Sequence, residues 1–312
     1  ADLVGRIGRG IHPLRGMGEC EAGMSEVGLS TVDEAADELV RSATMLPKVE
    51  GRSESSLRAW ATHSLIQCKR LLMVWMRDPT TTIQALVYPA LTLLMFRVVL
   101  GDSITAVTGR PSVYGTVPMI TLVAAMTGAM ISALGFKTEK TTGLLGRFWT
   151  MPVHRAAGLT GRLLAEAIRV LITTLFVIAV GYCIGFRFDQ GPLAAVALIG
   201  IPVLFGMGFA VFITALATLT EGVLLVNAIS IVTTLLMFFN SGFVPVMAYP
   251  TWLQSAVANQ PMSCAIEAMK GLSYGGPVAE PLIDTVLWVV GVIAVFGYPA
   301  VRGYRRAAET SG

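Results

Sequence analysis

The chain has 312 residues, of which 54% are hydrophobic and only 14% are charged, and its mean hydropathy is +0.67. Soluble domains carry about 25% charged residues, so this composition excludes a water-soluble globular protein and indicates an all-α, polytopic membrane protein. The formal net charge of +3 is too small to indicate a nucleic-acid partner, and none of the four cysteines lies in a C-x-x-C pair that would indicate a zinc or redox site.

The N-terminal quarter divides into a polar tail and an amphipathic segment. Residues 1–56 contain Gly and Ser throughout and no signal-peptide core, so we expect a mobile cytoplasmic tail. In residues 57–78, apolar residues at helical spacing alternate with basic residues and Trp, until Asp78 and Pro79 end the pattern. A plain soluble helix has the same periodicity, but the apolar run that follows at once favours a helix lying in the membrane interface.

Six apolar runs then have about the length that a helix needs to cross some 30 Å of hydrocarbon. They cover about 80–100, 115–136, 166–186, 192–219, 223–244 and 282–301. We therefore expect residues 79–306 to form a six-helix transmembrane domain, followed by a short cytoplasmic tail at 307–312.

The basic residues predict the orientation of these spans, because cytoplasmic loops carry an excess of Lys and Arg. Twelve basic residues fall on one side, in 69–77, 137–169 and 302–306, and four fall on the other, namely Arg97, Arg110, Arg187 and Lys270. This places both termini and the 137–169 loop in the cytoplasm, as expected of a plasma-membrane protein.

Residues 240–281 form one long connection on the outer side. Five prolines divide it into pieces that are too short to span the membrane and too apolar to be free loops. We expect a re-entrant or surface-lying helical hairpin, with Glu267 and Lys270 close enough for a local ion pair.

Motifs for catalysis are absent from the sequence. It contains no G-x-x-x-x-G-K-[ST] phosphate loop, no H-E-x-x-H and no G-x-S-x-G, so we expect neither an enzyme nor a metal site. Glu166 and Arg169 fall at the cytoplasmic start of the third span, within reach of water, and no acidic residue is expected at mid-membrane. A proton or sodium relay is therefore not supported.

The 137–169 loop is the one strongly basic island inside the apolar chain. Its middle, residues 143–152, predicts a short amphipathic helix whose Phe148 and Trp149 can enter a groove of a partner before Pro152 ends it. The alternative is a loop that is basic only because it is cytoplasmic, which suffices for Lys137, Lys140 and Arg162 but does not explain the aromatic pair and the proline.

Several motifs of this loop resemble a known family. Glu139 with Gly143, the segment RFWTMPVHR at 147–155 and the segment GRLLAEAIR at 161–169 resemble the cytoplasmic loop of ABC-2 type permeases. The similarity is greatest to the actinobacterial daunorubicin-resistance branch, whose mycobacterial members serve export of complex surface lipids. GFRF at 185–188, YPTWLQ at 249–254, NQPMS at 259–263 and AMKG at 268–271 resemble the same branch.

The resemblance implies a fold, partners and site residues. In that family two six-span permease chains, often non-identical, pair with two ATPase subunits that bind ATP and Mg, so this chain needs no cofactor of its own. A coupling helix docks on the ATPase, and outer helices lie over the exit. By this analogy the residues for ATPase coupling are Glu139, Gly143, Leu144, Arg147, Phe148, Trp149, Pro152 and Arg155. Those for the outer hairpin and exit are Asn240, Pro245, Trp252, Asn259, Gln260, Pro261 and Glu267.

The sequence and the resemblance together predict the membrane subunit of an ATP-driven exporter. Its substrate is expected to be hydrophobic or amphipathic: a lipid, a glycolipid or a lipid-like natural product such as an antibiotic. Two alternatives remain open at this point, a membrane-embedded enzyme that modifies lipids and an ion-coupled secondary transporter.

Overall fold

The computed structural model describes residues 56–144, 154, 156–219 and 223–310, all of which belong to one unit, Ser53–Gly312. Apart from Ser56, the expected mobile tail at 1–56 lies outside this part of the chain. The secondary structure of the described part is helical, as predicted. Its elements are α2 (Leu57–Arg77), α3 (Pro79–Val99), α4 (Gly101–Thr108), α5 (Val113–Thr141), α7 (Ala157–Cys183), α8 (Pro192–Leu219), α9 (Val223–Phe238), the 3-10 helix η1 (Val246–Ala248), α10 (Thr251–Asn259), α11 (Pro261–Tyr274) and α12 (Ala279–Thr310).

Five of the described helices are long and apolar enough to cross a membrane: α3, α5, α7, α8 and α12. Five of the six predicted spans therefore correspond to helices of sufficient length. The sixth, expected over 223–244, is represented by α9, which ends at Phe238 after 16 residues. At 1.5 Å per residue α9 is about 24 Å long, somewhat shorter than the hydrocarbon layer.

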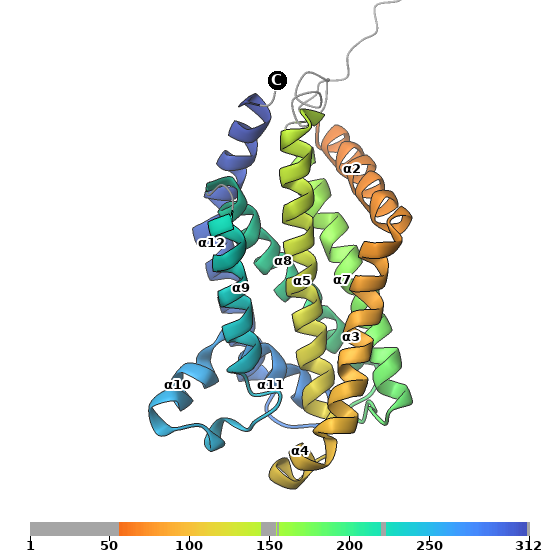
Figure 1. Cartoon of the computed structure of the whole chain (residues 1–312), viewed down its shortest axis with the longest axis vertical. Helices are drawn as coiled ribbons and strands as arrows, with labels where there is room; N and C mark the ends of the chain where they lie inside the picture. The colour runs from red at the N-terminus through yellow and green to blue at the C-terminus, as the bar shows by residue number, and fades with distance from the viewer. Residues whose placement is uncertain (1–55, 145–153, 155, 220–222, 311–312) are drawn as a thin grey trace, which may run out of the picture. The chain divides into compact units, whose positions relative to one another are not determined.

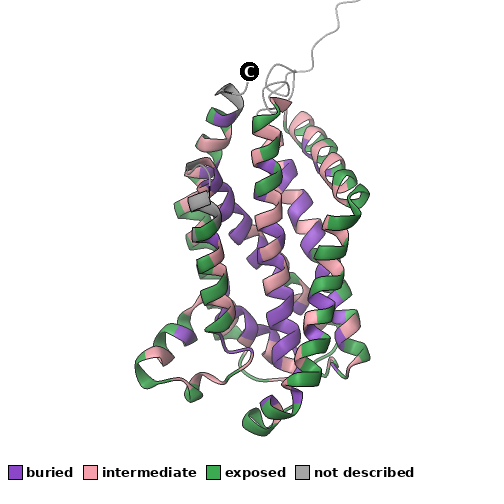
Figure 2. Ribbon diagram, viewed as in Figure 1, coloured by how far each residue is buried: buried purple, intermediate pink, exposed green. Residues whose placement is uncertain are grey.

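The long helices form a bundle in which consecutive spans alternate in direction (Figure 1). Helices α5 and α8 lie inside it: 61% and 56% of the residues in their most apolar stretches are buried, against 17% in α3 and 11% in α12. Figure 2 shows the same distinction, with buried residues on the inner faces and exposed ones along α3. The exposed faces of α3 and α12 are apolar, as expected of surfaces that meet lipid or another membrane protein.

One end of the bundle is formed by α2, the C-terminal end of α5 and the N-terminal end of α7, and we call it the α2 end. There α2 packs along α7, where Gly161 lies against the backbone of α2 and Ser64 shares a 2.7 Å hydrogen bond with Thr160. Helix α3 begins directly after α2 because Asp78 caps it, accepting a 3.1 Å hydrogen bond from the Thr80 N–H and another from the Thr81 hydroxyl. These bonds hold the pKa of Asp78 below its usual value, and the bond from the Thr81 side chain contributes most to this lowering.

The opposite end, which we call the α11 end, carries α4, α10 and α11 (Figure 1). The helical pieces predicted there exist, but they differ in burial: α11 is largely buried against α5, α8 and α12, whereas α10 is mostly exposed. Gly115 of α5 allows the chain after α9 to approach closely, since a Cβ at this position would lie 2.2 Å from the carbonyl oxygen of Gly242. In place of the expected re-entrant or surface-lying hairpin we therefore describe only its two helices, one buried and one exposed.

Two further boundaries differ clearly from those predicted, and one helix was not predicted. Helix α7 begins at Ala157, nine residues before the predicted start of the third span, and this brings Arg162 into the helix. Helix α12 continues to Thr310, so residues 307–310 are helix rather than tail. A short helix that we did not predict, α4, follows α3 at once. Hydropathy misses such extensions because helices continue past their apolar segments wherever neighbouring helices support them.

The contact of Gly161 with α2 generates a stability prediction. In Gly161→Ala, the added methyl would lie 2.7 Å from both the Ser64 carbonyl oxygen and the Gln67 Cβ, so α2 must shift. We expect the resulting overpacking to cost about 1–3 kcal/mol, which outweighs the roughly 0.5–1 kcal/mol gained by removing a helical glycine. Thermal unfolding in detergent measures the effect.

The matched control is Gly135→Ala on α5, where a Cβ meets nothing within 4 Å and only the propensity gain remains. Gly161→Ala should unfold at a lower temperature than the wild type, and Gly135→Ala at the same or a higher temperature. Equal melting temperatures for the two variants would show that α2 is not held at Gly161.

Candidate functional site

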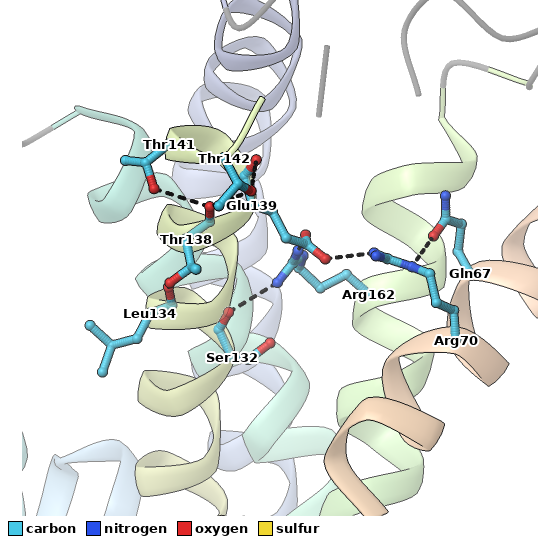
Figure 3. Close-up of polar contacts among 9 residues, drawn as sticks. All are labelled: Gln67, Arg70, Ser132, Leu134, Thr138, Glu139, Thr141, Thr142 and Arg162. Carbon is cyan, nitrogen blue, oxygen red and sulfur yellow. Dashed lines mark hydrogen bonds and ion pairs between the residues drawn. The ribbon is translucent and has the colours of Figure 1, made fainter. Parts of the chain in front are cut away.

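Charged side chains from three helices converge at the α2 end. Glu139 lies in the last turn of α5, Arg70 on α2 and Arg162 on α7 (Figure 3). The carboxylate of Glu139 accepts a 2.6 Å hydrogen bond from Nη2 of Arg70 through one oxygen and a hydrogen bond from Nη2 of Arg162 through the other. One carboxylate thus links three helices, and we call these three residues the Glu139 node.

Both arginines are also held by groups outside the node. Arg162 donates from Nη1 to the carbonyl oxygen of Ser132 at 3.0 Å, and Arg70 donates from Nε to the side-chain oxygen of Gln67 at 3.0 Å (Figure 3). The guanidinium carbon of Arg162 lies 5.3 Å from the ring centroid of Phe136, which stacks on Tyr304 of α12. The node is therefore also connected to the last helix.

Burial makes this pairing energetically important. The side chains of Arg162 and Glu139 are 7% and 14% exposed, whereas that of Arg70 is 30% exposed. An ion removed from water costs several kcal/mol unless it is paired and hydrogen-bonded, so Glu139 and Arg162 depend on each other more than either depends on Arg70. The prediction that Arg162 is an ordinary topology-setting charge is wrong.

A second ion pair lies deeper along the same face of α7. Glu166 and Arg169 follow Arg162 by four and seven residues, and Arg169 donates from Nη2 to Oε1 of Glu166, both side chains being buried. Gly128 of α5 makes room for the pair, because a Cβ there would lie 2.4 Å from Nη2 of Arg169. The expectation that Glu166 and Arg169 reach water at the start of the span is wrong, because α7 begins at Ala157 and both residues lie well inside it with buried side chains.

An open cavity of about 540 Å³ lies between α2, α3, α5 and α7 and contains both ion pairs in its lining. Its charged lining residues include Arg70, Glu139, Arg162, Glu166 and Arg169, and its apolar ones include Leu72, Val74, Trp75, Ile131 and Leu134. Arg169 also lines a smaller cavity of about 30 Å³ between α3, α5, α7 and α9. Among the described residues, no group of three or more His, Cys, Asp or Glu side chains is arranged to hold a metal ion.

The predicted coupling helix is only partly covered by the described residues. Gly143 follows the end of α5 with a φ of 69°, a left-handed conformation that favours glycine, and Leu144 is half-buried and lines the large cavity. Arg147, Phe148, Trp149, Pro152 and Arg155 lie outside the described residues. At the far end of the segment, the backbone N–H of His154 donates to Nδ1 of His63 on α2 at 3.1 Å.

Sequence reasoning therefore identified Glu139 but not its partners. Arg70 and His63 were treated as parts of an amphipathic pattern on α2, which gives no indication that they face α5 or the loop. The spacing of Arg162, Glu166 and Arg169 was the available sign, since three charged residues on one helical face beside a span indicate a buried polar strip.

The residues predicted for the outer hairpin order the chain that follows α9. Asn240 is fully buried, and its side chain bonds Leu236 and Met237 carbonyl oxygens and the N–H of Gly242. Gln260 donates to the carbonyl oxygen of Phe239, and the Asn259 carbonyl oxygen accepts a 2.8 Å bond from the Trp288 indole.

The remaining outer residues divide between contacts and surface. Glu267 and Lys270 form the predicted pair at 3.0 Å, and Lys270 also donates to the Ser241 carbonyl oxygen at 2.6 Å. Pro245 precedes η1 and Pro261 begins α11, whereas the Trp252 side chain on α10 is exposed. The polar contacts described at this end of the bundle are therefore hydrogen bonds and two ion pairs with an exposed partner, Glu267–Lys270 and, at 4.0 Å, Arg97–Asp102.

Comparison with known proteins relates this arrangement to a transporter family. A sequence model of the ABC-2 type transporter family matches residues 64–274, from within α2 to the last residue of α11. The chain is 41% identical over 256 residues to a protein of Mycobacterium tuberculosis, strains CDC 1551 and H37Rv, described as a probable doxorubicin resistance ABC transporter permease protein, DrrC. That match covers 82% of this chain and 93% of the relative.

A more distant relative has a similar description. The chain is 26% identical over 262 residues to the daunorubicin resistance ABC transporter permease protein DrrB1 of Streptomyces coeruleorubidus. This match covers 83% of the chain and 92% of the relative. Both relatives are thus matched over nearly their whole length.

The Glu139 node generates a second stability prediction. Glu139→Gln leaves the buried Arg162 without its carboxylate, and removing one partner of a buried pair costs about 3–5 kcal/mol. We expect the double variant Glu139→Gln/Arg162→Gln to regain part of this loss, because no uncompensated charge then stays buried. Unfolding by heat or denaturant in detergent micelles measures all three proteins.

The matched control is Glu267→Gln, which removes a 43% exposed carboxylate from its pair with Lys270, whose ammonium also donates to the Ser241 carbonyl oxygen. Glu267→Gln should lower the free energy of unfolding by only about 0–1 kcal/mol. If Glu139→Gln is no more destabilising than Glu267→Gln, the node does not hold the three helices together.

Proposed function

The chain belongs to the ABC-2 type transporter family, and we propose that it is the membrane-spanning permease subunit of an exporter driven by ATP hydrolysis in a separate ATPase subunit. The single observation that carries the mechanism is the Glu139 node at the end of α5. The segment that follows α5 at once is the predicted coupling helix, so a displacement of that segment acts first on the last turn of α5. Through Glu139 it acts on α2 and α7 as well.

The described geometry supports transmission by a continuous set of contacts. The segment is attached at both ends: to α5 through Gly143, and to α2 through the hydrogen bond between His154 and His63. Helices α2, α5 and α7 are bonded to one another at Glu139, and Arg162 contacts the aromatic pair that leads to α12. In this proposal the three helices move as one body when the ATPase subunits close on ATP.

We propose that the substrate is hydrophobic or amphipathic, of the lipid or lipid-like antibiotic class. The names of the relatives refer to doxorubicin and daunorubicin resistance, which supports transport of a compound that enters membranes. A groove of about 160 Å³ between α8, α9 and α12 also fits apolar material. Its lining consists of apolar side chains such as Phe205, Phe209, Phe212, Trp288 and Phe296.

We propose a second permease chain, non-identical to this one, and two ATPase subunits as partners. On one face of the bundle α5 lies between α3 and α9 (Figure 1), and we propose that this face contacts the second permease. Tyr88 of α3 and Met237 of α9 line one cavity there. The positive-inside rule supports an orientation with the α2 end and both termini in the cytoplasm, and hence the α11 end at the outer face of the plasma membrane.

Ion-coupled transport is less well supported. Glu166 is a buried carboxylate of the kind that such carriers use, but its ion pair with Arg169 gives it a structural partner. Purification of the membrane complex distinguishes the two mechanisms. We expect a soluble subunit with a phosphate loop to co-purify, and export to stop when ATP is depleted; export that continues without ATP would refute the proposal.

Gly143 allows a sharper test of coupling. Its positive φ excludes proline, whose ring fixes φ near −65°, and proline would also remove the N–H that donates to the Lys140 carbonyl oxygen at 3.2 Å. We expect Gly143→Pro to abolish ATP-dependent export while the chain still reaches the membrane. Export from cells that contain both partners measures this, with membrane levels determined in parallel.

The control is Gly143→Asn, because asparagine tolerates left-handed backbone better than other residues with side chains. We expect this variant to retain most of the export rate. Normal export by Gly143→Pro at a normal membrane level would contradict the assignment of this segment to coupling.

A further inference from the structure

We propose that the cavity between α2, α3, α5 and α7 binds the phosphodiester headgroup of a bilayer lipid, whose acyl chains lie along the apolar face of α2. The cavity volume, about 540 Å³, falls in the range of small-molecule sites, which is roughly 300–1,000 Å³. Its lining combines charged with apolar residues, as a lipid headgroup with its first acyl carbons requires.

Two N–H donors in residues that line the cavity are unpaired. Nε of Arg162 and the indole Nε1 of Trp75 are buried, and no hydrogen-bond acceptor for either lies within the described part of the chain. Arg162 as a whole is 6% exposed. A buried donor without an acceptor costs about 1–3 kcal/mol, so a ligand rich in acceptor oxygens would relieve both. Both residues line the cavity, which places these donors beside the proposed ligand.

The buried charges favour an anionic acceptor. Arg70, Arg162 and Arg169 line the cavity against the carboxylates of Glu139 and Glu166, which leaves an excess of one positive charge among these groups. Asp78 also lines the cavity, but its carboxylate is exposed to solvent and accepts hydrogen bonds from Thr80 and Thr81. A phosphodiester carries one negative charge and several acceptor oxygens, and arginine binds such groups well.

The surface next to the cavity suits acyl chains. Val74 lines the cavity and is 60% exposed, and its neighbours Met73 and Met76 on α2 are 41% and 71% exposed. Apolar residues exposed along a helix that also carries basic residues are typical of a helix lying at the level of lipid headgroups. The geometry thus joins a headgroup site to a path for the chains.

Binding to the purified full chain in a nonionic detergent tests the proposal. Three probes separate headgroup from chains: phosphatidylglycerol, diacylglycerol with the same acyl chains, and the free headgroup glycerophosphoglycerol. We expect saturable binding of phosphatidylglycerol at one site per chain and a raised melting temperature, with much weaker binding of the other two. Diacylglycerol binding as tightly as phosphatidylglycerol would show that only the chains are recognised. Glycerophosphoglycerol binding as tightly would show a site for a soluble phosphodiester. Either result overturns the proposal.

Two variants locate the site. Trp75→Phe removes the indole donor and keeps an aromatic ring; it should weaken phosphatidylglycerol binding by about tenfold, whereas the same change at Trp60, elsewhere on α2, should not. Gly135→Leu adds a side chain to the cavity lining at a position where a Cβ meets nothing within 4 Å, and it should reduce binding further; Gly291→Leu on α12, where a Cβ is equally free, is the control. Unchanged binding in both Trp75→Phe and Gly135→Leu would exclude this cavity. Because binding is measured without transport, such a failure would leave the proposed function untouched.

Discussion

A charge removed from water must be paired, and this requirement accounts for the arrangement of the α2 end. Arg162 is buried on α7 and needs a carboxylate; Glu139 supplies it from α5 and uses its second oxygen for Arg70 on α2. The interfacial position that we propose for α2 therefore depends on a polar contact as well as on its apolar face. Because Gly161 has no side chain, α2 lies close to α7, and Arg70 on α2 reaches Glu139.

The Glu139 node also determines which helices the proposed coupling moves. The segment after Gly143 leaves α5 within a turn of Glu139, so whatever moves the segment moves the point at which three helices are joined. We propose that ATP binding in the partner is transmitted as a movement of α2, α5 and α7 together, while α9, which is short and less extensively packed, adjusts against the second permease. In the proposed lipid site, the headgroup would lie against the residues of the Glu139 node, which line the same cavity. Bound lipid would then stabilise the packing of α2, α5 and α7, the helices that we propose move together.

Much of the fold follows from composition and periodicity, but the site does not. Long apolar runs predicted α3, α5, α8 and α12 well, because bilayer thickness sets a minimum length that few soluble helices reach. The same rule placed the start of the third span too late, since it counts Arg162 as a cost and cannot show that Glu139 pairs with it. Glu139 was found through its resemblance to a family loop, whereas Arg70, 69 residues away, becomes its partner only when α2 folds against α7. The burial of α11 was likewise hidden, because its apolar residues alone do not distinguish a surface hairpin from a core helix.

The distance between α2 and α5 during the ATP cycle tests the central claim most directly. Spin labels at Lys69→Cys on α2 and Thr138→Cys on α5, both exposed positions, report this distance in a chain whose native cysteines are replaced by alanine. We expect the same narrow distance distribution in the complex with and without a non-hydrolysable ATP analogue, and a broad one in Glu139→Gln. A wild-type distance that changes when the analogue binds would contradict the claim that Glu139 makes the helices move as one body.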